Sequence, residues 1–142
     1  MDLSIKLENT RLYIRVAGLV KTERGYLFEK SPKGYLYTLG GKIKLDESSK
    51  EAIAREVQEE IGMDVKNFTL RSVVENFFKT DEGNTHEICF FYEVDEFFTG
   101  ALPEGFFEIP ASELDNHDIR PAAMKEILKS APGSFKHIIN KE

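Results

Sequence analysis

Residues 48–61 carry the strongest local pattern in the sequence. Ala52, Ile53, Val57 and Ile61 recur mainly at helical spacing, and charged residues occupy the other faces. Gly62 follows directly and can end a helix in the left-handed conformation. The pattern therefore predicts one well-defined helix over 48–61, and the rest of the chain has to be fitted around it.

Most other segments resemble strands. Residues 11–21 are apolar and β-branched, and a turn at 23–25 predicts that 26–30 form the other arm of a hairpin. A short strand is expected over 35–39, ending at Gly40-Gly41. Residues 68–78 and 85–94 read as two strands joined by the turn 81–84. Residues 106–109 can add a further short strand.

The second strand of this later pair has apolar residues on both of its faces, which is typical of a strand covered on both sides. Pro121 suits the first position of a second helix that runs to about Ser130 and stops at Pro132-Gly133. Strands and helices in this order predict a sheet sandwiched between helices.

Length and composition limit the class of protein. The 142 residues suit one ordinary domain, and no repeat or linker divides them, so a single domain over 1–142 is expected. No window is apolar enough for a membrane span, and the N-terminus does not look like a signal peptide. Cys89 is the only cysteine, which suits a reducing cytoplasm. A net charge of −6 argues against binding to long nucleic acid.

Three glutamates stand close together on the predicted helix. Glu56, Glu59 and Glu60 are three and four residues apart, so they share one helix face, where their charges repel one another. Hard divalent cations such as Mg²⁺ or Mn²⁺ take oxygen ligands of this kind. The alternative is a solvated acidic face, which is the commoner meaning of such a pattern when it stands alone.

The surrounding residues complete a longer motif, Gly-x5-Glu-x7-Arg-Glu-U-x-Glu-Glu-x-Gly-U, in which U is a bulky aliphatic residue. Residues 41–63 resemble this Nudix box of the Nudix hydrolase superfamily. Nine residues fill every defined position: Gly41, Glu47, Arg55, Glu56, Val57, Glu59, Glu60, Gly62 and Met63. Leu39 departs from the Pro that many members have before the paired glycines, a change that affects no chemical group.

The resemblance implies an α/β fold, an α/β/α sandwich with a mixed sheet between helices. It also implies that Glu56, Glu59 and Glu60 ligate Mg²⁺, with Mn²⁺ as a possible substitute, helped by the backbone carbonyl of Gly40. Glu56 and Glu59 would then be catalytic, and Arg55 would orient a neighbouring carboxylate. Glu47 is expected to be the structural partner of Arg55, or equally a solvated or helix-capping acid.

Outside the box, Glu87 is the candidate for an additional catalytic carboxylate, because an acid entering an apolar strand is costly unless it is paired or bound to metal. Glu75 and Glu82 are its rivals, and Glu87 can also be read as the solvated end of its strand. His86 beside it reads as a structural or rim residue, since Mg²⁺ disfavours imidazole.

Phenylalanine occurs in four adjacent pairs, at 77–78, 90–91, 97–98 and 106–107. Core packing is the default expectation for most of them. Phe77, Phe78 or Phe98 could instead stack on a base.

The resemblance implies an enzyme that hydrolyses a phosphoanhydride bond in a nucleoside diphosphate linked to another group. A (d)NTP pyrophosphohydrolase that releases a nucleoside monophosphate is slightly favoured, because the short chain leaves little room for an extra domain. The expected partner is a small nucleotide, with no long nucleic acid or membrane, and the protein is a monomer or homodimer in the cytoplasm. The alternative is a non-catalytic Nudix-fold module that binds a nucleotide and regulates a partner.

Overall fold

The computed structural model describes all residues, 1–142. Its large sheet has the strand order β1-β2-β7-β6-β9, with β5 also paired to β2. Two pairs of neighbours, β2 with β7 and β6 with β9, are parallel and the other pairs are antiparallel, so the sheet is mixed as expected. The strands are β1 (Ser4–Leu7), β2 (Thr10–Leu19), β5 (Gly40–Lys42), β6 (Phe68–Thr80), β7 (Gly83–Val94) and β9 (Lys136–Lys141).

A smaller sheet has the order β4-β3-β8, from β4 (Leu36–Tyr37), β3 (Tyr26–Lys30) and β8 (Phe106–Ile109). The predicted hairpin between 11–21 and 26–30 forms only next to its turn, through the bridge from Lys21 to Tyr26 and the hydrogen bond from the Leu27 amide to the Val20 carbonyl. Beyond that point the two strands enter different sheets, so the prediction of a paired hairpin along their length is wrong. The turn between them explains the difference. The Thr22 hydroxyl accepts hydrogen bonds from the amides of Arg24 and Gly25. Gly25 packs closely on the Ile109 carbonyl, and β8 pairs with β3 from Tyr26 to Glu29.

The helix α1 (Ser49–Ile61) confirms the strongest pattern in the sequence. The Ser48 side chain caps its N-terminus by accepting a hydrogen bond from the amide of Glu51, at 3.1 Å. Gly62 ends the helix with a left-handed φ of 69°. The buried apolar residues of α1 are the four that showed helical spacing.

The remaining elements depart from expectation at their ends. The strands β6 and β7 are longer than predicted, because the turn needs only Asp81 and Glu82. The helix α2 (Ala123–Lys129) begins after Pro121, and a 3₁₀ helix, η1 (Ala111–Asn116), precedes it. The edge strands β1 and β9 were not predicted, because their residues are mostly exposed and carry no clear apolar alternation.

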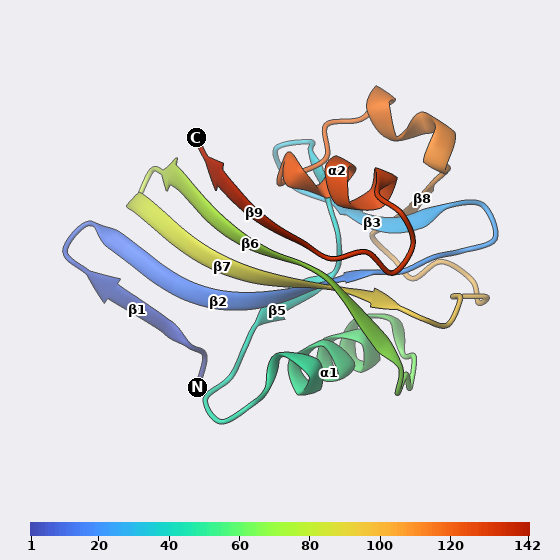
Figure 1. Cartoon of the computed structure of the whole chain (residues 1–142), viewed down its shortest axis with the longest axis horizontal. Helices are drawn as coiled ribbons and strands as arrows, with labels where there is room; N and C mark the ends of the chain where they lie inside the picture. The colour runs from blue at the N-terminus through green and yellow to red at the C-terminus, as the bar shows by residue number, and fades with distance from the viewer.

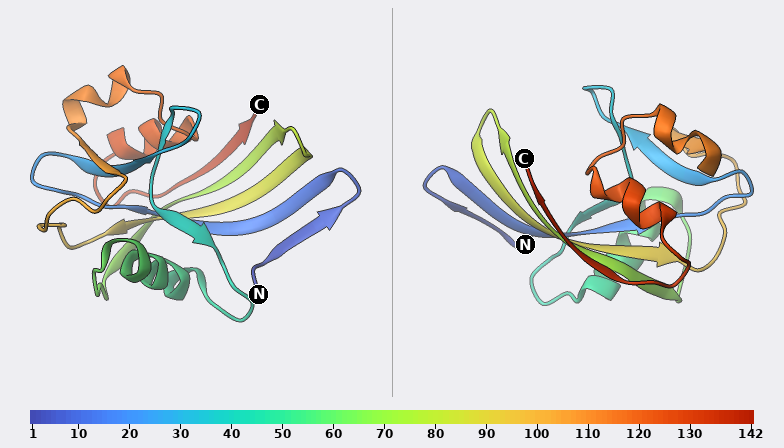
Figure 2. Two further views of the ribbon diagram at one scale, coloured as in Figure 1. Left: turned by 180° about the vertical axis from the view of Figure 1, so that it is seen from behind. Right: turned by 45° about the horizontal axis from the view of Figure 1, so that its top comes forward.

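Helix α1 covers one face of the large sheet, and β3, β8 and α2 cover the other (Figure 1; Figure 2 gives the view from behind). Two apolar cores result. Val16, Ile53 and Tyr92 belong to the core under α1, whereas Phe91 and Met124 belong to the core under α2. Both faces of β7 are therefore covered, as its sequence predicted. No helix is long and apolar enough to cross a membrane.

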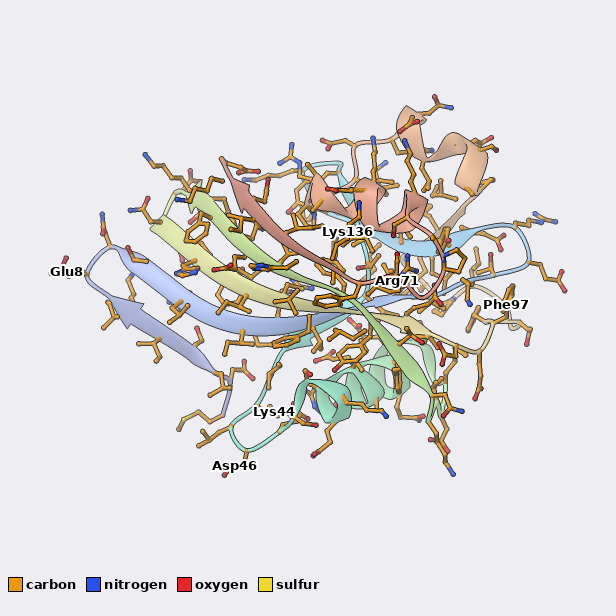
Figure 3. All side chains as sticks on the ribbon, viewed as in Figure 1. Glu8, Lys44, Asp46, Arg71, Phe97 and Lys136 are labelled. Atoms are coloured by element: carbon orange, nitrogen blue, oxygen red, sulfur yellow. The ribbon has the colours of Figure 1, made fainter.

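The buried side chain of Arg71 on β6 binds the segment that connects α2 to β9. The side chain of Arg71 is 4% exposed and forms an ion pair with Glu93 at 2.8 Å. Its guanidinium also donates hydrogen bonds to the carbonyls of Ile127, Ala131 and Ser134, at 3.0 to 3.2 Å. Figure 3 labels Arg71 beside this connection. These bonds satisfy a charge that would otherwise be costly to bury.

Candidate active site

The carboxylates of α1 meet the paired glycines of β5 at the edge of the large sheet. Glu60 Oε2 accepts a hydrogen bond from the amide of Gly40 at 3.1 Å. A Cβ on Gly41 would lie 2.2 Å from Glu56 Oε1, so a side chain there would displace the buried Glu56 carboxylate. A Cβ on Gly40 would lie 2.1 Å from the Val16 carbonyl. Both glycines thus allow a close approach that no other residue permits.

Arg55 ties three glutamates together. Its Nε and Nη2 donate to the two oxygens of Glu47, at 2.7 and 2.9 Å. Its Nη1 donates to Glu56 at 2.8 Å and, more weakly, to Glu59 at 3.4 Å. The hydrogen bond from Arg55 lowers the pKa of Glu47 to about 2. This network places Arg55 where it fixes the orientation of the Glu56 carboxylate.

Negative charge is concentrated around Glu60. Burial raises its pKa to about 7, and the charges of Glu29 and Glu56 add to the effect. Glu29 on β3 was missed by the sequence analysis. Burial also raises the pKa of Glu29, with a further contribution from Glu56. An acid in the apolar strand 26–30 was the signal that could have drawn attention to it.

The residue types fit a hard divalent cation, since they supply carboxylate and backbone oxygens and no sulfur or imidazole. The side chains are not gathered around a common point in this structure: no group of three acids, His or Cys stands close enough to hold a metal ion. Glu56 and Glu59 instead face Arg55, and Glu60 faces the Gly40 amide. A cation at this position would have to draw these carboxylates away from their present partners.

A pocket of about 470 Å³ lies on the face of the large sheet that is opposite α1. It adjoins the acidic edge, because the pocket residue Arg15 lies against Gly40, whose amide donates to Glu60. Residues of β2, β6 and β7 form its floor, and the β3–β4 loop and Arg120 form its walls.

Glu87 is 6% exposed and lines this pocket, so it is not a solvated strand end. Its rivals lie elsewhere. Glu75 pairs with His137 at 2.6 Å, and Glu82 lies in the exposed β6–β7 turn. Arg15 is close enough to both Glu87 and the α1 acid Glu60 to interact electrostatically with each.

The structure also shows which of the phenylalanines proposed to stack on a base lies in the pocket. Phe78 lines the pocket. Phe77 stacks on His86, with ring centroids 4.3 Å apart, and Phe98 is buried in the core under α1. His86 therefore has a packing partner and does not line the pocket. Tyr13, Arg15 and Asn76 are among the polar pocket residues that the sequence analysis missed.

Comparison with known families agrees with this geometry. The family model of the NUDIX domain matches residues 12–130, and the chain therefore belongs to the NUDIX domain family. The match includes α1, the paired glycines and the strands that form the pocket floor. A search of curated protein sequences found no match.

Several solved structures share the fold. A mMutator MutT protein from Bacillus halodurans has a TM-score of 0.72 at 22% identity, over 88% of this chain and 86% of that one. A MutT NUDIX hydrolase from Burkholderia pseudomallei has a TM-score of 0.68 at 19% identity, over 84% and 98%. The dihydroneopterin triphosphate pyrophosphohydrolase of E. coli has a TM-score of 0.61 at 13% identity, over 82% and 92%.

The complete Nudix box, assembled against the paired glycines in a NUDIX domain, defines the class of protein. The chain is a hydrolase that acts on acid anhydrides in phosphorus-containing compounds.

Proposed function

We propose that the chain is a metal-dependent nucleotide pyrophosphohydrolase. It cuts a phosphoanhydride bond in a nucleoside diphosphate linked to another group, and its preferred substrate is a nucleoside triphosphate, which yields a nucleoside monophosphate and pyrophosphate. The observation that carries this proposal is the position of the Glu56 and Glu60 carboxylates against Gly40 and Gly41, beside a pocket large enough for a nucleoside.

Glu56, Glu59, Glu60 and the carbonyl of Gly40 would hold Mg²⁺, with Mn²⁺ as a substitute. The ion would neutralise phosphate charge and lower the pKa of a water that attacks phosphorus. Arg55 holds the Glu56 carboxylate in place through a 2.8 Å hydrogen bond and is in turn held by Glu47. Burial raises the pKa of Glu60, and repulsion from Glu29 and Glu56 adds to it, so a positive charge here would offset both effects.

Each residue has a different task in this mechanism. Glu56 and Glu59 would hold the cation that lowers the pKa of the reacting water, and Arg55 restrains the Glu56 carboxylate through its hydrogen bond. For Glu87, a role as an additional catalytic acid stays a prediction. Its buried position in the pocket also suits a role in binding the substrate.

Composition bears on the kind of partner that the enzyme binds. The charge of −6 supports a small nucleotide as partner in preference to long nucleic acid. A cytoplasmic location and a monomeric or homodimeric state remain expectations.

A hydrolysis screen tests this function. Nucleoside triphosphates, nucleotide sugars, ADP-ribose and dinucleoside polyphosphates are incubated with the protein and Mg²⁺ or Mn²⁺, and phosphate and pyrophosphate are measured separately. Pyrophosphate release from triphosphates is the expected result, and Glu59→Gln is the inactive control. Binding of nucleotides without turnover under every condition would contradict the proposal and favour a regulatory module.

A further inference from the structure

A row of polar side chains crosses four adjacent strands, and three of its members, Tyr13, Glu87 and Asn76, line the pocket. Strand register places Tyr13 beside Glu87, Glu87 beside Asn76, and Asn76 beside Asn140. Arg15 lies two residues from Tyr13 on β2, so its side chain leaves the sheet on the same face. Apolar residues would normally fill such a position between two covered layers.

Several of these groups have unused hydrogen-bonding capacity. Arg15 Nε is buried without a hydrogen-bond partner, and the guanidinium forms no ion pair. The Asn76 amide accepts from Asn140 at 2.6 Å, and its own N–H groups donate to no protein atom. Glu87 is 6% exposed, and its neighbour across the strands is Tyr13, whose hydroxyl is close enough to interact with the carboxylate. Groups of this kind are costly to bury unless a ligand completes their hydrogen bonds.

The arrangement restricts the chemistry of that ligand. A phosphate would be repelled by Glu87, and an apolar group would leave both Arg15 and Glu87 unsatisfied. A carboxylate accepts two parallel hydrogen bonds best from adjacent N–H donors, whereas a guanidinium donates to carbonyl or ring nitrogen acceptors. The phenyl ring of Phe78 in the same pocket provides a surface on which a flat ring can stack.

We propose that Glu87 and Arg15 are specificity-determining residues that select a guanine ring. Its imino and amino N–H groups would bind the Glu87 carboxylate, and its carbonyl and N7 would accept from Arg15. Adenine presents an acceptor where guanine has its imino donor, and it presents an amino group where guanine has its carbonyl, so it cannot form the paired hydrogen bonds with either side chain. This inference rests on the proposed function for the location of the phosphates, and it gives Glu87 a role in recognition.

Binding without metal separates this inference from hydrolysis. Calorimetry in EDTA compares the affinities of the full-length protein for GMP, IMP and AMP. GMP is expected to bind at least about tenfold more tightly than AMP, because a site built around polar groups rejects a ligand that leaves them unpaired. IMP, which lacks the amino group alone, is expected to lie between them.

Variants test whether Glu87 and Arg15 cause the preference for GMP. Glu87→Gln should abolish the advantage of GMP over IMP, and Arg15→Gln should weaken GMP and IMP at least about tenfold while changing AMP little. Glu75→Gln, which alters an acid on the same sheet away from the pocket, should preserve all three affinities. Circular dichroism verifies folding, and Arg15→Lys replaces Arg15→Gln if the latter does not fold.

Two results would overturn the inference: equal binding of GMP and AMP by the unmodified protein, or an unchanged preference in Glu87→Gln. An equal loss of all three nucleotides in Arg15→Gln would reassign Arg15 to the phosphate and overturn its role in reading the base. Selective GMP binding by a protein that hydrolyses no triphosphate would instead contradict the proposed function and leave the inference standing.

Discussion

Replacing Glu60 by Gln should make the metal-free protein more stable at alkaline pH. The folded protein holds the pKa of Glu60 at about 7, above its ordinary value of 4.5, because the carboxyl group is partly buried beside Glu29 and Glu56. Between these two pH values the folded state binds a proton that the unfolded state has lost. The contribution of this residue to the free energy of unfolding therefore falls as pH rises from about 4.5 to about 7.

The size of the effect follows from the same values. The full difference corresponds to at most about 3.4 kcal/mol. Glu60 is partly exposed and solvent screens its charge, so about 1 to 2 kcal/mol is expected. Glu60→Gln removes the ionisation but keeps nearly the same shape. The variant should therefore gain this amount relative to the unmodified protein when pH is raised from 5 to 8.

Urea denaturation in EDTA at pH 5 and pH 8 measures this gain. Glu59→Gln provides a matched control on the same helix, because its side chain is 55% exposed. Saturating Mg²⁺ at pH 8 should stabilise the unmodified protein and reduce or reverse the difference from Glu60→Gln. If the two proteins differ in stability by the same amount at both pH values, the electrostatic reasoning is refuted.

The other predictions concern catalysis, metal and pH. Glu59→Gln should lower kcat at least about a hundredfold without changing the circular dichroism spectrum, and comparable turnover at saturating Mg²⁺ would refute its role. Mg²⁺ should raise the Tm, EDTA should reverse the rise, and changing the three ligand glutamates of α1 to Gln should abolish it. Because Arg55 depresses the pKa of Glu47 to about 2, this pair should lose its stabilising effect as pH falls from about 4.5 to about 2, and acid titration of Glu47→Gln should lack that component. In steady-state kinetics Glu87→Gln should raise KM for GTP more than it lowers kcat, whereas a large fall in kcat at constant KM would identify Glu87 as a catalytic acid.

Local sequence patterns were sufficient to predict the helices and hairpins that depend on residues close together in the chain. The ends of α1 follow from Ser48 and Gly62, and the hairpin of β6 and β7 follows from a polar turn between apolar strands. The pairing of β3 with β8 could not be predicted, because it joins segments far apart in the chain whose compositions do not specify each other.

The residues of the candidate site also include some that the sequence predicted and some that it could not. The acids of α1 were found because they recur at fixed spacing within a long motif. Arg15 and Glu29 are charged residues in largely apolar strands, and they belong to no recurring motif. Their importance depends on which strands lie side by side, as when parallel pairing brings Tyr13 next to Glu87.

Arg71 has a consequence for any attempt to shorten or split the chain. The exposed strand β9 could pass for an expendable tail, but the segment that leads into it supplies carbonyl acceptors to Arg71 from Ala131 and Ser134. Cutting after Ser130 would remove both acceptors and leave a guanidinium inside the protein with part of its hydrogen bonding unmet. The same cut would uncover β6, whose Asn76 holds Asn140, and would create a new edge open to aggregation. A tag or a fusion partner is therefore better tolerated after β9 than in its place.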